Sequence, residues 1–270
     1  MRPIGSLRRI GYLPVHQVLT RAHRRRRAGS VPIETFDELL AEHAQNRDTV
    51  FVHVGLRDIR SAFDTNPYRF LIDRLKSEFE SVITPGFTDY FKTSGVYHVN
   101  YSRPATGTFN RLFLEDADYR TLDAVKSFLV RGPYRFDGCV HDDTYHPEGC
   151  FARLIEDNVL VLNVGVPWVT CSIMHYLEAY HAVPYMEQRT FDGILYRDET
   201  RSTPITQRTG VYTSEYYSWN KRKIQRRLLD ADLLSASRLN GLWIGVFDLQ
   251  PVMDNLSRAI ARDPLYLVTL

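Results

Sequence analysis

The sequence predicts an α/β protein built around one mixed β-sheet. Short apolar runs rich in β-branched residues alternate along the chain with segments of helical length, the pattern of strands and helices in α/β folds. Several connections between these segments are long, which favours a sheet with antiparallel as well as parallel strands. No tract rich in Pro, Gly or Ser divides the chain. We therefore expect a single domain over residues 34–270.

Composition and charge exclude several classes of protein. The 270 residues are 44% hydrophobic and 24% charged, as in ordinary soluble proteins, which excludes a disordered chain, a collagen-like repeat and a coiled coil. The 34 Lys and Arg against 32 Asp and Glu give a net charge of +2, whereas a nucleic-acid-binding protein is usually more basic. No run reaches the roughly 20 apolar residues of a membrane helix, and the N-terminus lacks a secretory signal pattern. We expect a cytoplasmic protein without nucleic-acid or membrane partners; the composition does not indicate an oligomeric state.

Residues 1–33 form a basic leader that contains four consecutive arginines, Arg24 to Arg27. Such a run can contact an anionic surface or nucleic acid. It can equally be the solvated face of a helix, and we favour this alternative because the rest of the chain does not continue the charge.

The first third of the chain predicts three helices and two strands. Thr35 with Glu38 three positions later is typical of a helix start. Residues 50–54 are apolar and β-branched, as in a buried strand, and Pro85-Gly86 closes a second strand. The predicted order is a helix from Thr35, a strand over 50–54, a helix after Gly55, a helix over 67–79 and a strand over 81–84.

The remainder predicts two further strands and three helices. Residues 87–104 are too irregular for one element, whereas residues 159–166 are the strongest strand pattern in the chain. A helix from Ser172 to His181 should end before Pro184. The last predicted elements are a basic helix over 219–229, a strand over 241–249 and a helix over 251–262.

The segment from Ser172 to Glu178 carries the strongest chemical pattern. On a helix, His175 and Glu178 lie three positions apart on one face, so the carboxylate can orient the imidazole as a general base. Ser172 would lie at the helix N-terminus, where backbone N–H groups and the dipole can stabilise an oxyanion. The alternative is a helix-surface His–Glu pair with Ser172 as an ordinary N-cap.

A second candidate lies where the strand over 50–54 meets the next helix. His53 ends the strand and Gly55 precedes Leu56, and such junctions can bind phosphate through helix N–H groups. The glycine patterns of dinucleotide and P-loop sites are missing, so a plain strand–helix turn is the alternative.

Metal and thiol chemistry are disfavoured. Cys139, Cys150 and Cys171 are too few and too widely spaced for a disulfide framework or a zinc site, which also favours a reducing compartment. The polar cluster around His141 and His146 matches no standard metal pattern and is better explained as a loop. Cys171 precedes the candidate helix, but a thiol nucleophile there is the weaker interpretation.

Six segments from about residue 34 to the C-terminus match, in order, those of one enzyme family. Residues 52–56 are similar to its VHSSL, residues 84–88 to MPTFT, Thr106-Gly107 to the TG before a helix, residues 120–128 to RSxHPxxSF, Gly165-Val166 with Ser172, His175 and Glu178 to GV…TxxHxxE, and Asp263-Pro264 with Leu265 to the final motif. The chain thus resembles the aminoglycoside 3-N-acetyltransferase (antibiotic N-acetyltransferase) family.

This resemblance implies a fold, a reaction and a set of site residues. The fold would be a three-layer α/β/α sandwich around a mixed sheet. The reaction would be acetyl transfer from acetyl-CoA to an amine in a ternary complex, without a metal, with His175 as base, Glu178 as its partner and Ser172 near the oxyanion. The residues expected to line the CoA site are His53, Val54, Gly55, Leu56, Thr84, Pro85, Phe87 and Ser127.

Departures from the family motifs bear on the substrate. Val54 and Gly55 replace both serines of the first motif, and Asp123 with Ala124 replaces His-Pro in the second. We expect Asp123 to contact the acceptor, and we expect an amino sugar or other small amine from a biosynthetic reaction rather than an aminoglycoside antibiotic. The alternative is a catalytically degenerate member that acts as a binding or scaffold protein.

Overall fold

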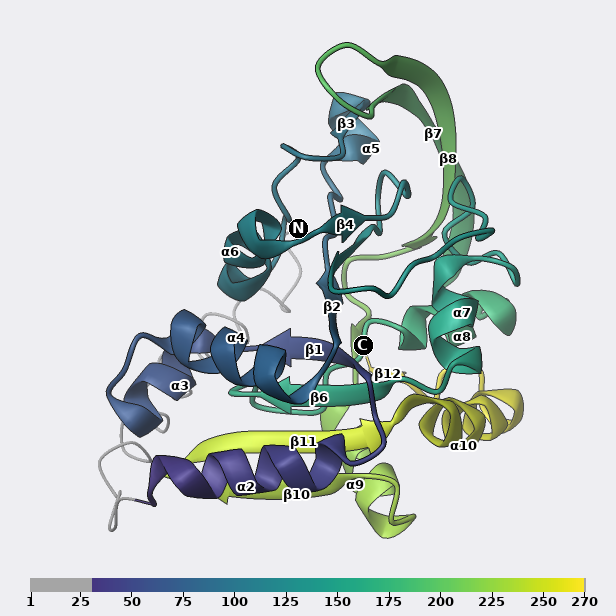
Figure 1. Ribbon diagram of the computed structural model, residues 1–270. Coiled ribbons are helices and arrows are strands. Elements are labelled where there is room, and N and C mark those ends of the chain that lie inside the picture. The colour runs from purple at the N-terminus through teal and green to yellow at the C-terminus, as the bar shows by residue number, and fades with distance from the viewer. Residues whose placement is uncertain (1–30, 270) are drawn as a thin grey trace, which may run out of the picture.

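The computed structural model describes residues 31–269 and confirms an α/β fold around one mixed sheet (Figure 1). This main sheet has seven strands in the order β10-β11-β6-β1-β2-β5-β4. Their bounds are β1 Thr49–Val54, β2 Ser81–Pro85, β4 Tyr119–Arg120, β5 Phe128–Arg131, β6 Leu160–Val164, β10 Ser235–Leu239 and β11 Leu242–Asp248.

The centre of the sheet is parallel and its flanks are antiparallel. Strand β1 pairs in parallel with β2 and with β6, so Phe51 lies opposite Ile83 on one side and Val161 on the other. Strands β11 and β5 then pair antiparallel to β6 and β2. The central strands are buried on both faces, which explains why their sequences are almost continuously apolar.

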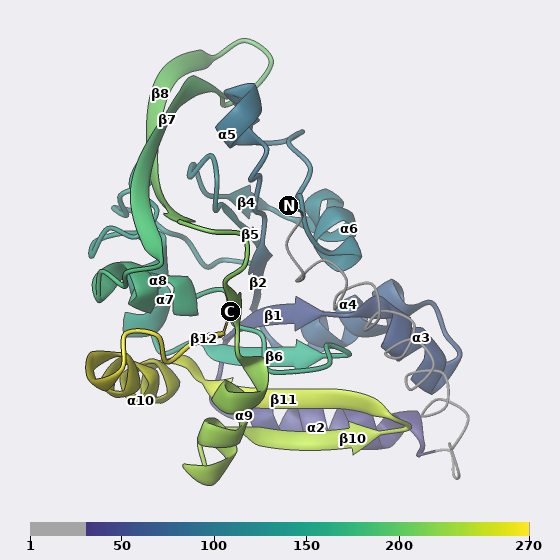
Figure 2. The same cartoon turned by 180° about the vertical axis from the view of Figure 1, so that it is seen from behind.

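Helices cover both faces of the main sheet and complete three layers (Figures 1 and 2). Alternate residues of one strand point to opposite faces: Val50 and Val52 belong to one hydrophobic core and Phe51 to the other. The first core packs against α2 (Ile33–Ala44), α3 (Leu56–Phe63), α4 (Pro67–Glu78) and α6 (Thr108–Asp116). The second packs against α7 (Cys150–Glu156), α8 (Met174–Tyr180), α9 (Lys221–Asp230) and α10 (Leu249–Arg262).

A second sheet stands at one end of the sandwich (Figure 1). It consists of β3 (Val96–His98) and a long antiparallel hairpin of β7 (Met186–Tyr196) and β8 (Ser202–Tyr212), beside the short helix α5 (Phe91–Ser94). A third pair joins β9 (Ser218–Trp219) to β12 (Val268–Thr269). The hairpin was not predicted, because most of its residues are exposed or half-buried and lack the apolar pattern of a core strand.

Several predicted boundaries differ from the structure. Helix α2 begins at Ile33 after Pro32, so Thr35 lies inside the helix and is not its cap. Helix α8 begins at Met174, so Ser172 lies in the turn that precedes it. Strand β6 ends at Val164. The basic leader lies outside the described residues except for 31–33. No helix within residues 31–269 is both long and apolar enough to span a bilayer.

Candidate active site

His175 and Glu178 form a close pair on helix α8. The imidazole Nδ1 lies 2.6 Å from Oε2 of Glu178, as the three-residue spacing predicts. The Glu178 side chain has no exposed surface, whereas the His175 side chain is 25% exposed. Because Nδ1 is held by the carboxylate, Nε2 is the ring nitrogen available to a ligand.

Three further donors surround the Glu178 carboxylate. The hydroxyl of Tyr185 donates to Oε1 at 3.0 Å, the hydroxyl of Tyr212 lies 2.9 Å and 3.1 Å from the two carboxylate oxygens, and Nε1 of Trp219 donates to Oε1 at 2.8 Å. Burial and the nearby Glu178 raise the pKa of both tyrosines above the usual range, so they remain neutral donors. We call Tyr185, Tyr212 and Trp219 the carboxylate cage.

The same aromatic side chains hold the His175 ring. The Trp219 ring lies 4.4 Å from the imidazole centroid, and the Tyr212 ring meets the imidazole edge-on at 5.8 Å. The cage residues lie in the turn before β7, at the end of β8 and in β9. Sequence analysis missed them because no local spacing connects them to Glu178. The only available signal was that buried tyrosine and tryptophan side chains need hydrogen-bond acceptors.

Ser172 lies beside this pair and carries an unused hydroxyl. The Ser172 side chain is buried, and its Oγ has no hydrogen-bond partner within residues 31–269. Two side chains at the ends of adjacent strands hold the segment before α8: Nε2 of His53 accepts from the Ser172 N–H at 3.2 Å, and Oδ1 of Asn163 accepts from the Thr170 N–H at 2.6 Å. The Ser172 N–H is therefore occupied, and its hydroxyl is the group that can meet an oxyanion.

His53 consequently has an internal partner, and its place in the CoA site stays a prediction. Burial and the nearby Lys221 lower the pKa of His53 to about 3, so the imidazole is neutral and can accept the Ser172 N–H. Val54, Gly55 and Leu56 are partly exposed at the following junction. The Gly55 N–H donates to the Val164 carbonyl at 2.8 Å, so it is not free for a phosphate.

The other residues predicted for the CoA site are enclosed in the protein. Pro85 is buried and Phe87 belongs to the core. The Thr84 hydroxyl donates to Oδ1 of Asn110 at 2.7 Å, and the Ser127 hydroxyl donates to the Gly86 carbonyl at 2.8 Å. The Thr84 hydroxyl joins β2 to α6 and the Ser127 hydroxyl joins two loops, so both have a structural role.

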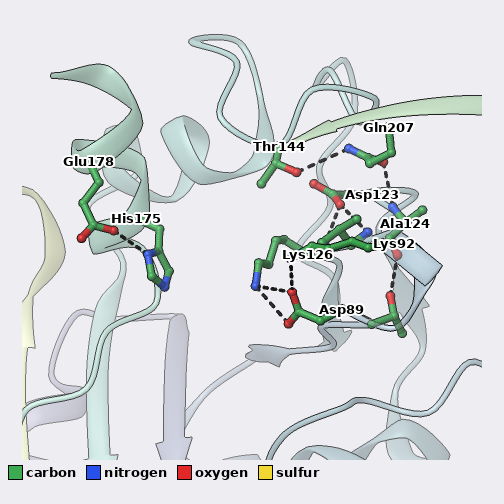
Figure 3. A network of polar contacts seen from close by, with 11 residues as sticks. Asp89, Lys92, Asp123, Ala124, Lys126, Thr144, His175, Glu178 and Gln207 are labelled. Carbon is green, nitrogen blue, oxygen red and sulfur yellow. Dashed lines mark hydrogen bonds and ion pairs between the residues drawn. The ribbon is translucent and has the colours of Figure 1, made fainter. Parts of the chain in front are cut away.

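Asp123 is also buried, with only 3% of its surface exposed. Its Oδ1 accepts the backbone N–H groups of Val125 and Lys126 at 2.8 Å and 2.6 Å, which stabilises the turn before β5. Burial raises the pKa of Asp123 to about 6. The expected contact between Asp123 and an acceptor stays a prediction, and in this structure the carboxylate is enclosed with its Oδ1 already in use. The neighbouring Lys126 is the more accessible charged group (Figure 3).

The remaining candidates show no catalytic arrangement. Burial raises the pKa of Cys171 to about 12, so its thiol is not an activated nucleophile. In the polar cluster before α7, Asp143 pairs with Arg208 at 3.4 Å and His141 lies 3.3 Å from the Cys150 sulfur. Across residues 31–269, no three His, Cys, Asp or Glu side chains are grouped so that they could hold a metal ion.

Comparison with known proteins gives one family match. The profile described as aminoglycoside 3-N-acetyltransferase matches residues 80–260, more than half of the chain. Comparison with curated protein sequences gives no significant match.

Solved structures with the same fold belong to distant relatives. Aminoglycoside acetyltransferase AAC(3)-Xa is 18% identical, with a TM-score of 0.67 over 90% of this chain and 97% of its own. AAC-IIIb, solved as a binary complex with CoASH, is 14% identical, with a TM-score of 0.66 over 84% and 96%. The YokD protein of Bacillus subtilis is 13% identical, with a TM-score of 0.63 over 84% and 94%. At these identities the likeness shows a shared fold.

Proposed function

The chain belongs to the aminoglycoside 3-N-acetyltransferase family, and from this premise we propose that His175 is the general base of an acetyl transfer to an amino sugar or related small amine. Family membership makes the protein an N-acetyltransferase with acetyl-CoA as donor. The observation that carries the proposal is the His175–Glu178 pair, whose carboxylate is fully buried and fully hydrogen-bonded.

The base has to remove a proton from an amine that is protonated at neutral pH. Nε2 of His175 takes this proton, and the amine nitrogen then forms a bond to the thioester carbonyl carbon. The first proton passes from the imidazolium to solvent. As the carbon–sulfur bond breaks, Nε2 takes the second proton of the attacking nitrogen, and the imidazolium gives it to the departing CoA sulfur. The products are the amide and CoA, and no acyl group is attached to the enzyme.

Glu178 and its cage support this proton transfer. The carboxylate fixes which imidazole nitrogen faces the amine and stabilises the imidazolium that forms. Tyr185, Tyr212 and Trp219 donate neutral hydrogen bonds, so the negative charge of Glu178 remains available to His175.

Ser172 is the candidate donor to the developing oxyanion. Its buried hydroxyl lacks a partner within the described chain, and such a group costs free energy unless a ligand or water meets it. Its backbone is held by His53 directly before α8, three residues from His175. A pre-positioned donor of this kind stabilises charge that appears only in the transition state.

We propose that the acceptor belongs to a biosynthetic reaction rather than to antibiotic resistance. The support is the loss of the family's His-Pro and of both serines of its first motif, at Asp123-Ala124 and Val54-Gly55. AAC-VIa was solved with sisomicin bound, and a mutant of AAC(3)-IVa was solved in complex with a gentamicin. For this protein, sisomicin and gentamicin are only compounds to include in a test panel of amines.

The test is CoA release from acetyl-CoA by the purified full chain in the presence of a panel of amines. His175→Ala should lower kcat by about 10²–10⁴-fold, the contribution of a positioned base, while CoA binding stays nearly unchanged. Tyr212→Phe removes one cage donor and should lower kcat by about tenfold, as expected for losing about 1.5 kcal/mol at a charged acceptor.

The matched control is His181→Ala, at the other end of α8, whose imidazole bonds Ser257. It should leave kcat near the wild-type value. Normal turnover in His175→Ala would remove the base from the mechanism. CoA binding without turnover for any amine would instead support the degenerate binding protein.

A further inference from the structure

A group of charged side chains lies beside the active site and has no part in the proton transfer. We call Asp89, Lys92 and Lys126 the Lys126 cluster. The Lys126 ammonium lies 3.0 Å and 3.1 Å from the two carboxylate oxygens of Asp89, and the Lys92 ammonium lies 2.8 Å from the same group. One carboxylate therefore serves two ammonium groups.

The enclosure of Lys126 makes this arrangement unusual. Its side chain is only 13% exposed, whereas that of Asp89 is 37% exposed. Asp123 adds a second negative charge nearby, but it is almost fully buried and its Oδ1 is used by two backbone N–H groups. The two positive charges of the lysines equal the two negative charges of Asp89 and Asp123 in number. Because Asp123 is enclosed, a ligand would meet two ammonium groups and one carboxylate.

A chain of aromatic contacts leads from Lys126 toward the catalytic pair. The Lys126 ammonium lies 4.7 Å above the Phe87 ring, Phe87 stacks on Phe151, and Phe151 meets Tyr145 edge-on. Figure 3 shows the Lys126 ammonium and the His175 ring turned toward the same space.

Tyr145 stands at the end of this chain of aromatic contacts and carries a phenol hydroxyl. Burial raises the pKa of Tyr145 well above the usual range, and the negative charges of Glu178, Asp123 and Asp89 contribute to this shift. Its side chain packs against Gly210 at the end of β8, two residues before the cage residue Tyr212. The residue is 9% exposed, and its backbone N–H donates to Oδ1 of Asp143 at 3.3 Å, which holds the backbone of Tyr145 in position.

We propose that Tyr145 and the Lys126 cluster bind the acceptor, and that the acceptor carries an acidic group, a carboxylate or a phosphate, besides its amine. The inference rests on the proposed function, because it requires the amine to reach His175. An acidic group would lie against Lys126, while the Tyr145 hydroxyl would hydrogen-bond the body of the ligand. A polyamine such as sisomicin would bring positive charge against two ammonium groups, so this site selects against it.

The experiment compares acceptors that differ only in the acidic group. Glucosamine, glucosamine 6-phosphate and 2-amino-2-deoxyglucuronic acid are each assayed by CoA release with the full chain and saturating acetyl-CoA, and sisomicin serves as the polyamine. At least one acidic amine should exceed glucosamine in kcat/KM by about tenfold or more, and sisomicin should fall below glucosamine. The two acidic probes distinguish a phosphate from a carboxylate.

Lys126→Met should raise KM for the preferred acidic amine by about 10- to 100-fold more than KM for glucosamine, as expected for losing one member of an enclosed charge pair. KM for acetyl-CoA should not change. Lys76→Met removes a lysine from α4, on the opposite face of the sheet, and is the matched control with wild-type parameters. If Lys126→Met does not fold, Tyr145→Phe keeps the ring and should still raise KM for the acidic amine.

Two outcomes separate this inference from the function on which it rests. Equal kcat/KM for glucosamine and both acidic amines, or a preference that survives in Lys126→Met, overturns the inference and leaves the acetyl transfer intact. No CoA release with any amine overturns the proposed function. In that case, calorimetric binding of either acidic amine in the presence of CoA, lost in Lys126→Met but kept in Lys76→Met, would still support the acceptor site.

Discussion

A carboxylate without solvent contact keeps its charge only where hydrogen-bond donors replace water. Glu178 meets this condition with two phenols, one indole and one imidazole. Of these four donors only the imidazole is a base in the proposed reaction, and a proton that arrives at His175 is stabilised by a negative charge that the other donors do not neutralise. The carboxylate cage therefore fixes the position of the Glu178 carboxylate, while the negative charge of Glu178 acts on His175.

His53 shows the opposite use of a buried histidine. It lies at the end of β1 opposite Asn163, and both side chains hold the segment that carries Ser172. A proton on Nε2 would remove the lone pair that accepts the Ser172 N–H, so the fold requires the neutral imidazole.

His53 should make stability depend on pH in the acidic range. Its pKa is about 3 in the folded protein against 6.5 ordinarily, so the unfolded chain binds the proton more readily between these values. The stability linked to neutral His53 is thus complete above pH 6.5 and is lost as pH falls toward 3.

His53→Gln keeps an acceptor but does not titrate. The loss of unfolding free energy from about pH 7.5 to about pH 4.5, measured with urea, should be about 2–3 kcal/mol smaller in this variant. An identical loss in both proteins would contradict the assignment.

For single residues, the sequence predicted contacts between side chains that lie close together in the chain. The contact between His175 and Glu178 follows from a helical repeat and is present in the structure. Tyr212 and Trp219 lie 34 and 41 positions from Glu178, and only the folded chain brings them together. The same limit applies to Ser127 and Thr84, whose hydroxyls looked available in the sequence but bond residues distant in the chain, Gly86 and Asn110.

Among the elements, the buried strands were predictable and the hairpin was not. The central strands β1 and β6 are apolar on both faces, and such runs stand out in a sequence. The strands β7 and β8 pair over eleven positions, yet their side chains are mostly exposed or half-buried. Backbone hydrogen bonds hold this hairpin, and they leave little trace in the side-chain pattern.

The loops after β1 and β6 approach so closely that they need glycine. A Cβ on Gly55 would overlap the carbonyl oxygen of Gly165, and a Cβ on Gly165 would overlap the carbonyl oxygen of Gly55. Gly165 also has a φ of 71°, which L side chains rarely adopt. The substitution of serine by Gly55 in the first family motif therefore has a structural consequence: it permits this backbone contact.

Gly55→Ala should destabilise the protein more than Gly138→Ala, although only Gly138 has a positive φ. The φ of Gly55 is −110°, which alanine can adopt. The loss of unfolding free energy in Gly55→Ala would therefore arise from the clash with Gly165 and should be at least about 2 kcal/mol. Gly138, with φ of 78°, has nothing within 4 Å of an added Cβ, so only backbone strain of about 1 kcal/mol is expected. Denaturant unfolding measures both values. Equal losses, or the reverse order, would show that the two loops separate freely.

For the whole molecule, the three sheets share side chains in ways that favour one cooperative unit. Tyr185 and Met186 at the base of the hairpin pack with the core that also contains Phe51 and Val161 of the main sheet. The C-terminal strand β12 pairs with β9, which carries the cage residue Trp219. The alternation of strands and helices predicted an α/β fold around a mixed sheet, and the family resemblance implied the three-layer sandwich; both are confirmed. The attachment of the hairpin to that core depends on long-range packing and was not predictable.

This architecture leads to a prediction about ligand binding and unfolding together. A ligand that binds only the folded state stabilises it by RT ln(1 + [L]/Kd), which is about 2.7 kcal/mol at about 100 times Kd. For a chain of this size that free energy corresponds to an increase in Tm of about 5–10 °C. Saturating acetyl-CoA should therefore raise Tm by this amount, in one transition that moves as a whole, if residues 34–270 form one domain. His175→Ala should keep the shift, because its imidazole acts on the amine rather than on the nucleotide.

The measurement is a thermal melt with acetyl-CoA, with free CoA and without ligand. Unchanged melting with both CoA forms would contradict donor binding, whereas a shift confined to one of two transitions would show that the hairpin and the sandwich unfold separately.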